Sequence, residues 1–243
     1  MKVLVPIGGS DENFRQHGHA YAKPLVEIAG KPLVQHALVP LQNIGASQMI
    51  FVIRKEDELR FFLRDVLGLL EPGAVVIRAD GPTAGAACTA LLAIEHIDND
   101  EELVIANADQ VLDFDLADMI GRFRARGLDA ATVVFDSVHP RWSFVKIDSD
   151  GMVVEAAEKR PISRDATAGI YYFRKGSFFV EAAASMIRKD AHVNGGFFVC
   201  PSLNEMVLAQ KRVGVERIDR SHYISLATPQ AVEEYEQFLK ARV

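Results

Sequence analysis

The sequence predicts an α/β fold with a Rossmann-like core, a mixed and mostly parallel sheet, and a small β-rich part in its second half. Through residue 138, short apolar runs alternate with segments of helical periodicity, and glycines follow the first run. Short β-type segments begin near Trp142. Alternating strands and helices of these lengths favour an open sheet covered by helices on both faces. Ligands of such sheets bind beyond the carboxyl ends of the strands.

Five short apolar runs in the first half are typical of buried strands, at 2–7, 49–53, 74–77, 103–106 and 130–135. The segments between them have helical spacing. One helix is expected to begin near Pro32, and two others span 59–70 and 84–97. A fourth follows Asp115, a suitable N-cap, and ends near Gly127. Right-handed crossovers through these helices make the connected strands parallel.

The second half begins with three short β segments and ends with helices. The β segments are at 144–147, 152–155 and 168–173, and a turn at 148–151 joins the first two. Helices are expected near 177–188, 202–210 and 229–239. Because no repeat or linker interrupts the chain, we expect one domain over 1–243. Its apolar C-terminal helices could serve a homodimer interface or complete a monomer.

Composition limits the classes of partner. The 243 residues carry a formal net charge of −6, with 49% hydrophobic and 25% charged residues. This balance is usual for a soluble globular protein, and an acidic chain is a poor partner for nucleic acid. No apolar run approaches a membrane span or a signal-peptide core, so we expect a cytoplasmic protein that binds no membrane. Cys88 and Cys200 are expected to be free thiols.

The loop after the first strand is the first candidate site. Gly8 and Gly9 follow an apolar strand, where glycines let backbone amides approach a phosphate closely. Lys23 and Lys31 lie further along and could neutralise that phosphate. A plain tight turn is the alternative, because two glycines form neither a dinucleotide fingerprint nor a Walker A loop.

The segment Asn107-Ala108-Asp109-Gln110 is the second candidate site. It follows the strand at 103–106, so Asp109 stands at a carboxyl end, where a divalent metal would meet phosphates. Magnesium prefers carboxylate and phosphate oxygens as ligands. The alternative is that Asp109 only caps a turn.

The order of these segments resembles that of the sugar-phosphate nucleotidyltransferases, whose core is similar to that of glycosyltransferases that use nucleotide-sugars. The match spans nearly the whole chain, and the order is more specific than any one segment. The matching segments are VPIGG (5–9), AKPL (22–25), GKPL (30–33), GPTAGAA (81–87), NADQ (107–110), EKRP (158–161), AGIY (168–171) and Ala-Thr-Pro (227–229).

The resemblance implies a reaction in which an acceptor phosphate oxygen attacks the α-phosphorus of an NTP and pyrophosphate leaves. Positioning and electrostatic stabilisation do most of the work in such a transfer. Lys23 would contact phosphates at the reacting centre, and Asp109 would hold Mg²⁺. Lys159 would neutralise the acceptor phosphate, and Glu158 would accept hydrogen bonds from acceptor hydroxyls. Without the family, Glu158 and Lys159 could equally be an exposed charge pair.

The same resemblance divides the expected site between two parts of the chain. Residues 1–138 would form the nucleotide-binding part and 139–243 the acceptor-binding part with the C-terminal helices. The implied nucleotide-binding residues are Gly8, Gly9, Lys23, Thr83, Gly85, Ala86 and Asp109. The implied acceptor-binding residues are Ser143, Glu158, Lys159 and Gly169.

Three features are similar to a branch found with capsule and surface-polysaccharide synthesis genes. They are the Asn-x-Asp-Gln pattern at 107–110, the pair Trp142-Ser143 and the segment 166–173. That branch includes cytidylyltransferases acting on unusual phosphorylated metabolites. The resemblance implies the reaction type better than the substrate, so the base and the acceptor stay open.

The chain departs from the family pattern at two places. The phosphate loop of the family continues with a glycine and an arginine, where this chain has Asp11 and Asn13, and Glu12 lies between them. Unscreened repulsion from these carboxylates would oppose a polyphosphate, unless Arg15 substitutes for the arginine. A second metal-binding aspartate of the family is replaced by Ser225.

These departures leave three functions open. The leading one is a magnesium-dependent nucleotidyltransferase that uses CTP or another NTP and a phosphorylated sugar or related metabolite. The second is a catalytically degraded protein that binds a nucleotide or sugar phosphate. The third is a glycosyltransferase that uses a nucleotide-sugar, although Asp109-Gln110-Val111 lacks the Asp-x-Asp pair usual in that class.

Overall fold

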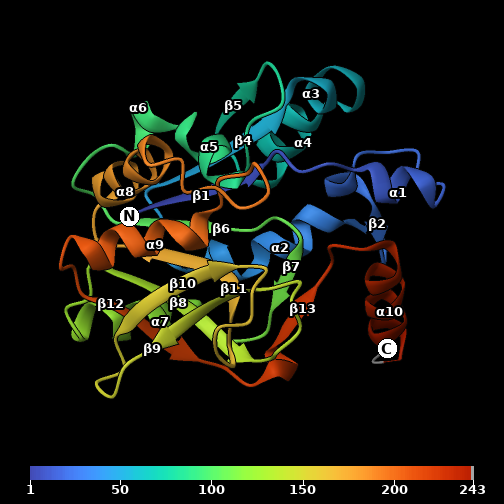
Figure 1. Cartoon of the computed structure of the whole chain (residues 1–243). Coiled ribbons are helices and arrows are strands. Elements are labelled where there is room, and N and C mark those ends of the chain that lie inside the picture. The colour runs from blue at the N-terminus through green and yellow to red at the C-terminus, as the bar shows by residue number, and fades with distance from the viewer. Residues whose placement is uncertain (242–243) are drawn as a thin grey trace.

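A nine-stranded mixed sheet with helices on both faces forms the centre of the computed structural model, which describes residues 1–241 (Figure 1). Its strands are β1 (Lys2–Ile7), β4 (Gln48–Arg54), β5 (Val75–Ala79), β6 (Leu103–Ala106), β8 (Ala130–Asp136), β9 (Ser143–Ile147), β10 (Val153–Glu158), β11 (Asp165–Phe173) and β12 (Val213–Arg217). The order along the main path is β10-β9-β11-β6-β1-β4-β5, and β8 joins β11 and β12. The α/β class predicted from the sequence is confirmed.

Helices and small sheets surround this centre. The small strands are β2 (Glu27–Ile28), β3 (Lys31–Pro32), β7 (Gln110–Leu112) and β13 (Tyr223–Ser225), paired as β2-β3 and β13-β7. The α-helices are α1 (Glu12–Gln16), α2 (Leu33–Gln42), α3 (Lys55–Phe61), α4 (Leu63–Leu70), α5 (Ala86–Leu91), α6 (Ile94–Ile97), α7 (Leu116–Ala125), α8 (Gly176–Arg188), α9 (Val199–Leu208) and α10 (Pro229–Lys240). Two 3₁₀ turns are η1 (Lys23–Leu25) and η2 (Arg220–His222).

The parallel part of the sheet brings four strand ends to one edge. β1 pairs with β4 on one side and β6 on the other, and β5 pairs with β4, all in parallel. The residues that follow these strands are Gly8, Lys55, Asp80 and Asn107. They therefore lie along the edge at which open parallel sheets bind ligands.

The second half of the chain extends the same sheet with antiparallel strands. β11 pairs with β6 through 170–173, with β9 through 165–166, and with β8 along its other side. Its register with β8 shifts between Thr167 and Tyr171, a stretch that contains Gly169 at a φ of 63°. The β-rich part predicted from the sequence is the antiparallel end of the central sheet.

Alternation along the strands divides the core between the two faces of the sheet. In β1, Val3, Val5 and Ile7 belong to the cluster that includes side chains of α2, α4 and α7. Leu4 belongs to the cluster that includes side chains of α5, α8 and α9. Successive strand residues point to opposite faces, so both faces are apolar and both need helices to cover them.

Two helices are divided where the periodicity predicts continuity. The segment 59–70 breaks between α3 and α4 at Phe62, whose φ of 54° is left-handed. The segment 84–97 is divided into α5 and α6. Apolar spacing reports which face is buried and does not detect one residue that leaves the helical region. The N-cap at Asp115 is confirmed, since its side chain accepts a hydrogen bond from the backbone N–H of Asp118 at 2.9 Å.

The last helix lies beside α1 and β2 at one side of the molecule (Figure 1). It begins at Pro229, and the hydroxyl of the N-cap Thr228 accepts a hydrogen bond from Ala231 N at 3.3 Å. Whether the C-terminal helices form a homodimer interface stays a prediction. Across residues 1–241, no helix has the length and apolar character needed to traverse a membrane.

Candidate functional site

Lys23 and Asp109 meet at the carboxyl edge of the parallel strands. Lys23 Nζ donates a hydrogen bond to Asp109 Oδ2 at 2.7 Å, and the two side chains are 17% and 24% exposed. Both line a cavity of about 210 Å³ that Gly9, Asp11 and Asn107 also line. The sequence predicts both side chains at the reacting centre, and the fold places them together across 86 positions of sequence.

Short elements at the edge of the sheet hold this pair in place. Asp109 follows β6, and its carbonyl oxygen accepts a hydrogen bond from Leu226 N at 2.7 Å. Leu226 comes directly after β13, which pairs with β7, the strand that follows Asp109. Lys23 opens η1, in which Leu25 N donates to Ala22 O at 2.8 Å. Both charged groups are therefore carried by turns that hydrogen bonds fix.

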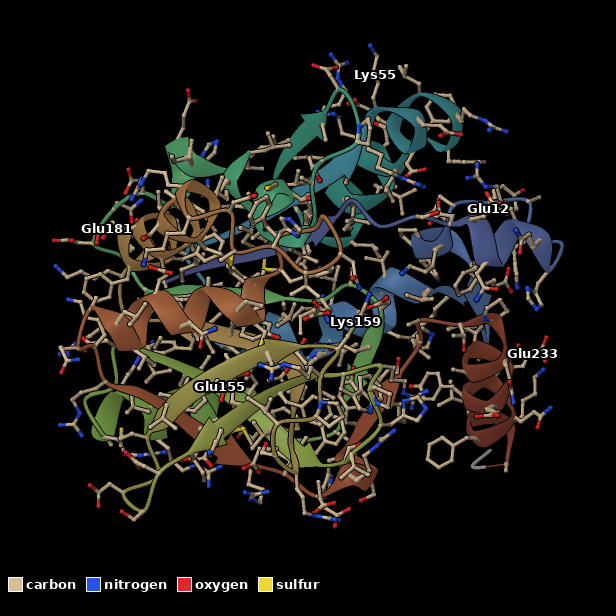
Figure 2. All side chains as sticks on the ribbon, in the orientation of Figure 1. Glu12, Lys55, Glu155, Lys159, Glu181 and Glu233 are labelled. Carbon is tan, nitrogen blue, oxygen red and sulfur yellow. The ribbon has the colours of Figure 1, made fainter. Side chains whose placement is uncertain are left out.

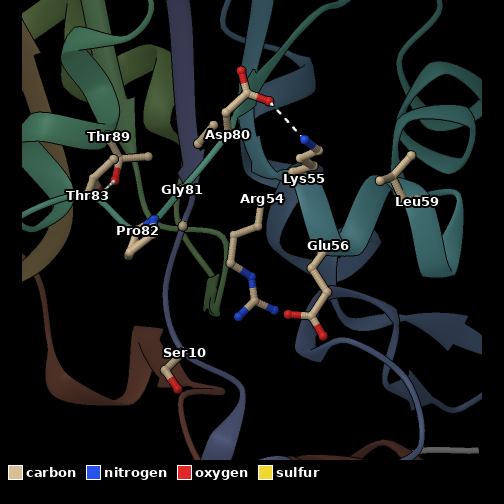
Figure 3. Close-up of a pocket in the computed structure, with 12 residues that line it drawn as sticks. Ser10, Arg54, Lys55, Glu56, Leu59, Asp80, Gly81, Pro82, Thr83 and Thr89 are labelled. Atoms are coloured by element: carbon tan, nitrogen blue, oxygen red, sulfur yellow. Dashed lines mark hydrogen bonds and ion pairs between the residues drawn. The ribbon is translucent and has the colours of Figure 1, made fainter.

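A larger cavity of about 560 Å³ shares the 8–11 loop with the first (Figure 3). Of the predicted nucleotide-binding residues, Gly8 and Thr83 line the larger cavity, whereas Gly9 and Ala86 line the smaller one. The volume is within the range of small-molecule sites in proteins. The two cavities together can hold a ligand with an uncharged end and a phosphorylated end.

Gly8 is required by the packing behind the larger cavity. A Cβ at this position would lie 2.9 Å from the hydroxyl of Thr89, which shares a 2.6 Å hydrogen bond with the hydroxyl of Thr83. At Gly9 a Cβ would meet nothing within 4 Å. The two glycines thus differ, because only the first is required for close packing of the protein itself.

Gly85 connects the larger cavity to the second half of the chain. Its φ is 106°, and a Cβ would lie 2.4 Å from the carbonyl oxygen of Phe197. That carbonyl accepts a hydrogen bond from Ala87 N at 3.0 Å, and Phe197 N donates to Ala84 O at 2.7 Å. The glycine-containing turn is therefore attached to the loop between α8 and α9 by backbone hydrogen bonds.

Two of the predicted acceptor residues face each other at the ends of β9 and β10. Ser143 Oγ donates to Glu158 Oε2 at 2.5 Å. Burial raises the pKa of Glu158, although the hydrogen bond from Ser143 and the charge of Lys159 act in the opposite direction. Glu158 is thus a carboxyl group whose protonation responds to its hydrogen-bond partner.

Lys159 lies next to a different cavity from Lys23. Its φ of 52° is left-handed, its N–H donates to Trp142 O at 3.0 Å, and its Nζ lies 5.2 Å from the centre of the Phe198 ring. It lines a cavity of about 480 Å³ with Glu158 and the loop before α9. Figure 2 shows Lys159 near the middle of the view, between the parallel and antiparallel parts of the molecule. Of the predicted three-residue centre, Lys23 and Asp109 form a close pair, whereas Lys159 lines a separate cavity that shares no lining residue with theirs.

Gly169 supports the Asp109 segment. A Cβ at this left-handed position would lie 2.4 Å from both Asn107 Nδ2 and Gln110 Oε1. The carbonyl of Gly169 accepts hydrogen bonds from Asn107 N at 3.1 Å and from the amide of Gln110 at 3.2 Å. Whatever its contact with an acceptor, this glycine is needed for the close approach of β11 to the turn that carries Asp109.

Sequence reasoning missed Arg54, which changes the electrostatics of the phosphate loop. Arg54 donates to Asp57 through Nε and Nη2 at 2.7 and 2.8 Å, and Nη2 also contacts Asp11. Asp11 is therefore a buried carboxylate that shares the positive charge of Arg54 with Asp57, so the repulsion expected at that position is partly screened. Glu12 is exposed on α1, where Arg15 lies 3.4 Å from it. Arg15 faces Glu12 and Glu56 on the surface and lines neither the larger nor the smaller cavity at the 8–11 loop.

The metal site predicted at Asp109 has few protein ligands. Among residues 1–241, no group of three or more His, Cys, Asp or Glu side chains is placed to hold an ion. Ser225 pairs with Gln110 across β13 and β7, and it lines a cavity beside α10 rather than the one at Asp109. Magnesium commonly keeps several waters and takes one or two carboxylates plus substrate phosphates. A single carboxylate fits an ion that arrives with a nucleotide better than a permanently bound one.

Comparison with known proteins gives the family of the chain and several relatives. The Nucleotidyl transferase family matches residues 2–212. Mannose-1-phosphate guanylyltransferase 1 of Arabidopsis thaliana is 27% identical over 177 residues, which cover 70% of this chain and 49% of the relative. The catalytic subunit beta of mannose-1-phosphate guanylyltransferase from Drosophila pseudoobscura pseudoobscura is 26% identical over 176 residues, 71% of this chain and 47% of the relative. The chain spans about half the length of these curated relatives.

A solved structure shares the fold along nearly the whole chain. The nucleoside-diphosphate-sugar pyrophosphorylase from Vibrio cholerae RC9 superposes with a TM-score of 0.86 at 21% sequence identity, covering 97% of this chain and 99% of that one. The match of the family to 2–212 includes Lys23, Asp109 and Lys159. This chain belongs to the Nucleotidyl transferase family.

Proposed function

We propose that this protein condenses an NTP with a phosphorylated sugar or a related small metabolite and releases pyrophosphate. The observation that carries the proposal is the Lys23–Asp109 pair, which lines a small cavity next to one large enough for a nucleoside. The family and the relatives named above support the same reaction type. A nucleotide with its base in the larger cavity would have its phosphates beside this pair.

In this mechanism an acceptor phosphate oxygen attacks the α-phosphorus of the NTP in line, and the bond to pyrophosphate breaks. Lys23 would stabilise the charge that develops on the phosphoryl oxygens. Lys159, which lines the separate cavity with Glu158, would hold the acceptor phosphate in position for attack. Both contributions are electrostatic, as phosphoryl transfer requires.

Mg²⁺ is the proposed cofactor because of the charges that line the two cavities. Three cationic and five carboxylate side chains line them, a formal charge of −2. A nucleotide polyphosphate is itself strongly anionic, so the lining alone would oppose its binding. Asp109 would hold the ion, which neutralises phosphate charge and polarises the phosphoryl oxygens when bound. One of its oxygens accepts the hydrogen bond from Lys23, and the other accepts no hydrogen bond within residues 1–241.

The proposal specifies the residues around the nucleotide and the acceptor more closely than the identity of the base or of the acceptor. On the resemblance, Thr83, Gly85 and Ala86 would bind the nucleotide from the 1–138 part of the chain, with Thr83 in the larger cavity beside the base and Ala86 in the smaller one. Ser143, Glu158, Lys159 and Gly169 would surround the acceptor from the 139–243 part. The relatives named above are guanylyltransferases. We propose CTP as the alternative to GTP, and a role in capsule or surface-polysaccharide synthesis, on the resemblance of the Asn107–Gln110 segment.

The test is pyrophosphate release measured with each of the four NTPs against a panel of phosphorylated sugars, amino acids and choline, with Mg²⁺ present. We expect one NTP and one acceptor class to give turnover. Tight binding of an NTP with no turnover for any pair would instead support the catalytically degraded binding protein. Transfer of the sugar from a nucleotide-sugar, with release of a nucleoside diphosphate or monophosphate and no pyrophosphate, would support the glycosyltransferase.

The pH dependence of acceptor binding should depend on Glu158. Its pKa is raised by burial, so the carboxylate that accepts acceptor hydroxyls is lost as the pH falls through this raised value. We expect the KM for the acceptor to increase on lowering the pH, with kcat less affected. In Ser143→Ala the hydrogen bond that lowers this pKa is removed, so the increase in KM should begin at a higher pH.

A matched control separates Glu158 from the acceptor phosphate, which also titrates near neutral pH. Titration of the phosphate is a property of the substrate and is the same for every variant. In Glu158→Gln the contribution of the carboxyl group should disappear, leaving the phosphate alone. Identical KM profiles for the wild type and Ser143→Ala would exclude Glu158 as the titrating group.

A further inference from the structure

A buried ion-pair cluster of Asp11, Arg54 and Asp57 lies in the wall between the two cavities. Arg54 ends β4 and lines the larger cavity, where its guanidinium extends between Ser10 and Glu56 (Figure 3). Asp11 and Asp57 line the smaller cavity. The Arg54 side chain is 21% exposed, whereas those of Asp11 and Asp57 are 6% and 2% exposed. The cluster is thus at the boundary that a ligand spanning both cavities must cross.

The two carboxylates hold Arg54 in different ways. Asp57 accepts from both Nε and Nη2, three positions along the chain in the first turn of α3. Asp11 contacts Nη2 alone, and it belongs to the loop before α1. A bidentate pair fixes the plane of a guanidinium, whereas a contact to one nitrogen can be exchanged with less rearrangement. Asp57 therefore orients Arg54, and Asp11 occupies one of its donors.

Arg54 retains hydrogen-bonding capacity toward the larger cavity. Within residues 1–241, Nη1 of Arg54 makes no hydrogen bond to a protein acceptor. Burial disfavours the charge on Arg54, but the hydrogen bonds and charges of Asp57 and Asp11 outweigh burial and raise its pKa. The group stays a cation in the wall of the cavity, with Glu56 as the other charged side chain on its exposed side.

The other cations near this boundary are less suited to a polyphosphate that crosses it. Lys23 is held by Asp109 in the smaller cavity. Lys55 is 49% exposed and lies 3.8 Å from Asp80 at the far side of the larger cavity (Figure 3). Arg15 is on the surface, next to Glu12 and Glu56. Asp11 and Asp57 line the same cavity as Lys23, so the β- and γ-phosphates that continue from an α-phosphorus beside Lys23 would meet the contact between Asp11 and Arg54.

We propose that Arg54 is the polyphosphate-binding cation of this chain, and that Asp11 occupies the position of a phosphate oxygen until the nucleotide arrives. The inference rests on the proposed function, because it assumes that the two cavities take an NTP. On binding, a polyphosphate oxygen replaces the Asp11 carboxylate at Nη2, and Asp57 keeps the guanidinium oriented. The carboxylate in the phosphate loop thus competes with the nucleotide for one donor.

The experiment is calorimetric titration of the purified protein, with Mg²⁺, against the nucleoside, monophosphate and triphosphate of each base, and against inorganic pyrophosphate. Arg54→Lys keeps the positive charge but removes the planar guanidinium with its several N–H donors. Because hydrogen bonds between charged groups are lost, triphosphate binding should weaken on the order of tenfold or more. Asp11→Asn removes the competing charge and should strengthen triphosphate binding on the order of tenfold. Nucleoside binding should stay within about twofold in both variants.

Two controls separate this role from general effects. Glu12→Gln removes a neighbouring charge of the same sign from an exposed position that does not contact Arg54, so it should leave triphosphate affinity within about twofold. In the double variant Arg54→Lys/Asp11→Asn the gain from Asp11→Asn should shrink, since the two residues compete through one group. Thermal unfolding of each variant establishes that it is folded at the titration temperature.

The possible results distinguish failure of the Arg54 proposal from failure of the proposed function. Equal gains from Asp11→Asn and Glu12→Gln, or equal losses for nucleoside and triphosphate in Arg54→Lys, would overturn the role of Arg54 while leaving NTP binding intact. Should Arg54→Lys fail to fold, Asp11→Asn and Glu12→Gln still decide the question, because neither leaves a buried charge unpaired at Asp57. Absence of binding of every NTP and of pyrophosphate to the wild type would overturn the proposed function and this inference together. Binding without turnover would remove the catalytic proposal alone.

Discussion

Asp109→Ala should lower kcat on the order of 10²–10³-fold while the protein stays folded. Asp109 supplies the carboxylate that would bind the metal, and it also holds Lys23 Nζ at 2.7 Å. Removing it affects both groups that would stabilise the transferring phosphoryl group. Its side chain is 24% exposed, so the substitution leaves no large cavity in the core. The measurement is pyrophosphate release at saturating substrates, together with circular dichroism of the variant.

Two control variants test whether the loss of kcat in Asp109→Ala comes from the missing carboxylate. Asp113→Ala changes a carboxylate four positions away whose side chain is 76% exposed, and turnover should stay within about twofold. Asp109→Asn retains size and removes the charge, so it should need a higher Mg²⁺ concentration than the wild type for half-maximal activity. Turnover of Asp109→Ala within tenfold of the wild type would show that the metal is held elsewhere.

The position of Asp109 could be predicted from sequence because it depends on one local regularity. A short apolar run followed by polar residues predicts a strand and its carboxyl end, and β6 has the predicted bounds. The same regularity locates Gly8 after β1. Where a site residue directly follows a strand of a parallel sheet, the sequence pattern alone places it at the binding edge.

The pairing of Asp11 with Arg54 could not be predicted in the same way. It depends on how a loop after β1 folds over the end of the neighbouring strand β4, a contact between positions 43 apart. One signal was available: Arg54 follows the apolar run 49–53, so it stands at the same edge as Gly8. A search for cations at every predicted strand end would have found it, whereas a search of the phosphate loop alone finds two uncompensated carboxylates.

The antiparallel part of the sheet shows a different limit. The sequence indicates the strand at 168–173, but β11 begins at Asp165 and includes a register shift near Gly169. β9 and β10 extend the central sheet because β11 is paired along both of its edges. One edge pairs with β8, and the other pairs with β6 and β9. Pairings of this kind are long-range, and local periodicity contains no information about them.

Lys23→Ala should also lower kcat on the order of 10²–10³-fold, because Lys23 is the cation that lines the cavity with Asp109. The composition of the loop offers both Lys23 and Lys31, and the family resemblance implies Lys23. Lys31 is exposed on β3 and does not line the cavity at Asp109, so Lys31→Ala should have activity within about twofold of the wild type. Lys23→Ala should retain nucleoside binding, since the base would lie in the larger cavity. A larger loss of kcat in Lys31→Ala than in Lys23→Ala would mean that the reacting phosphates lie outside the Lys23–Asp109 cavity.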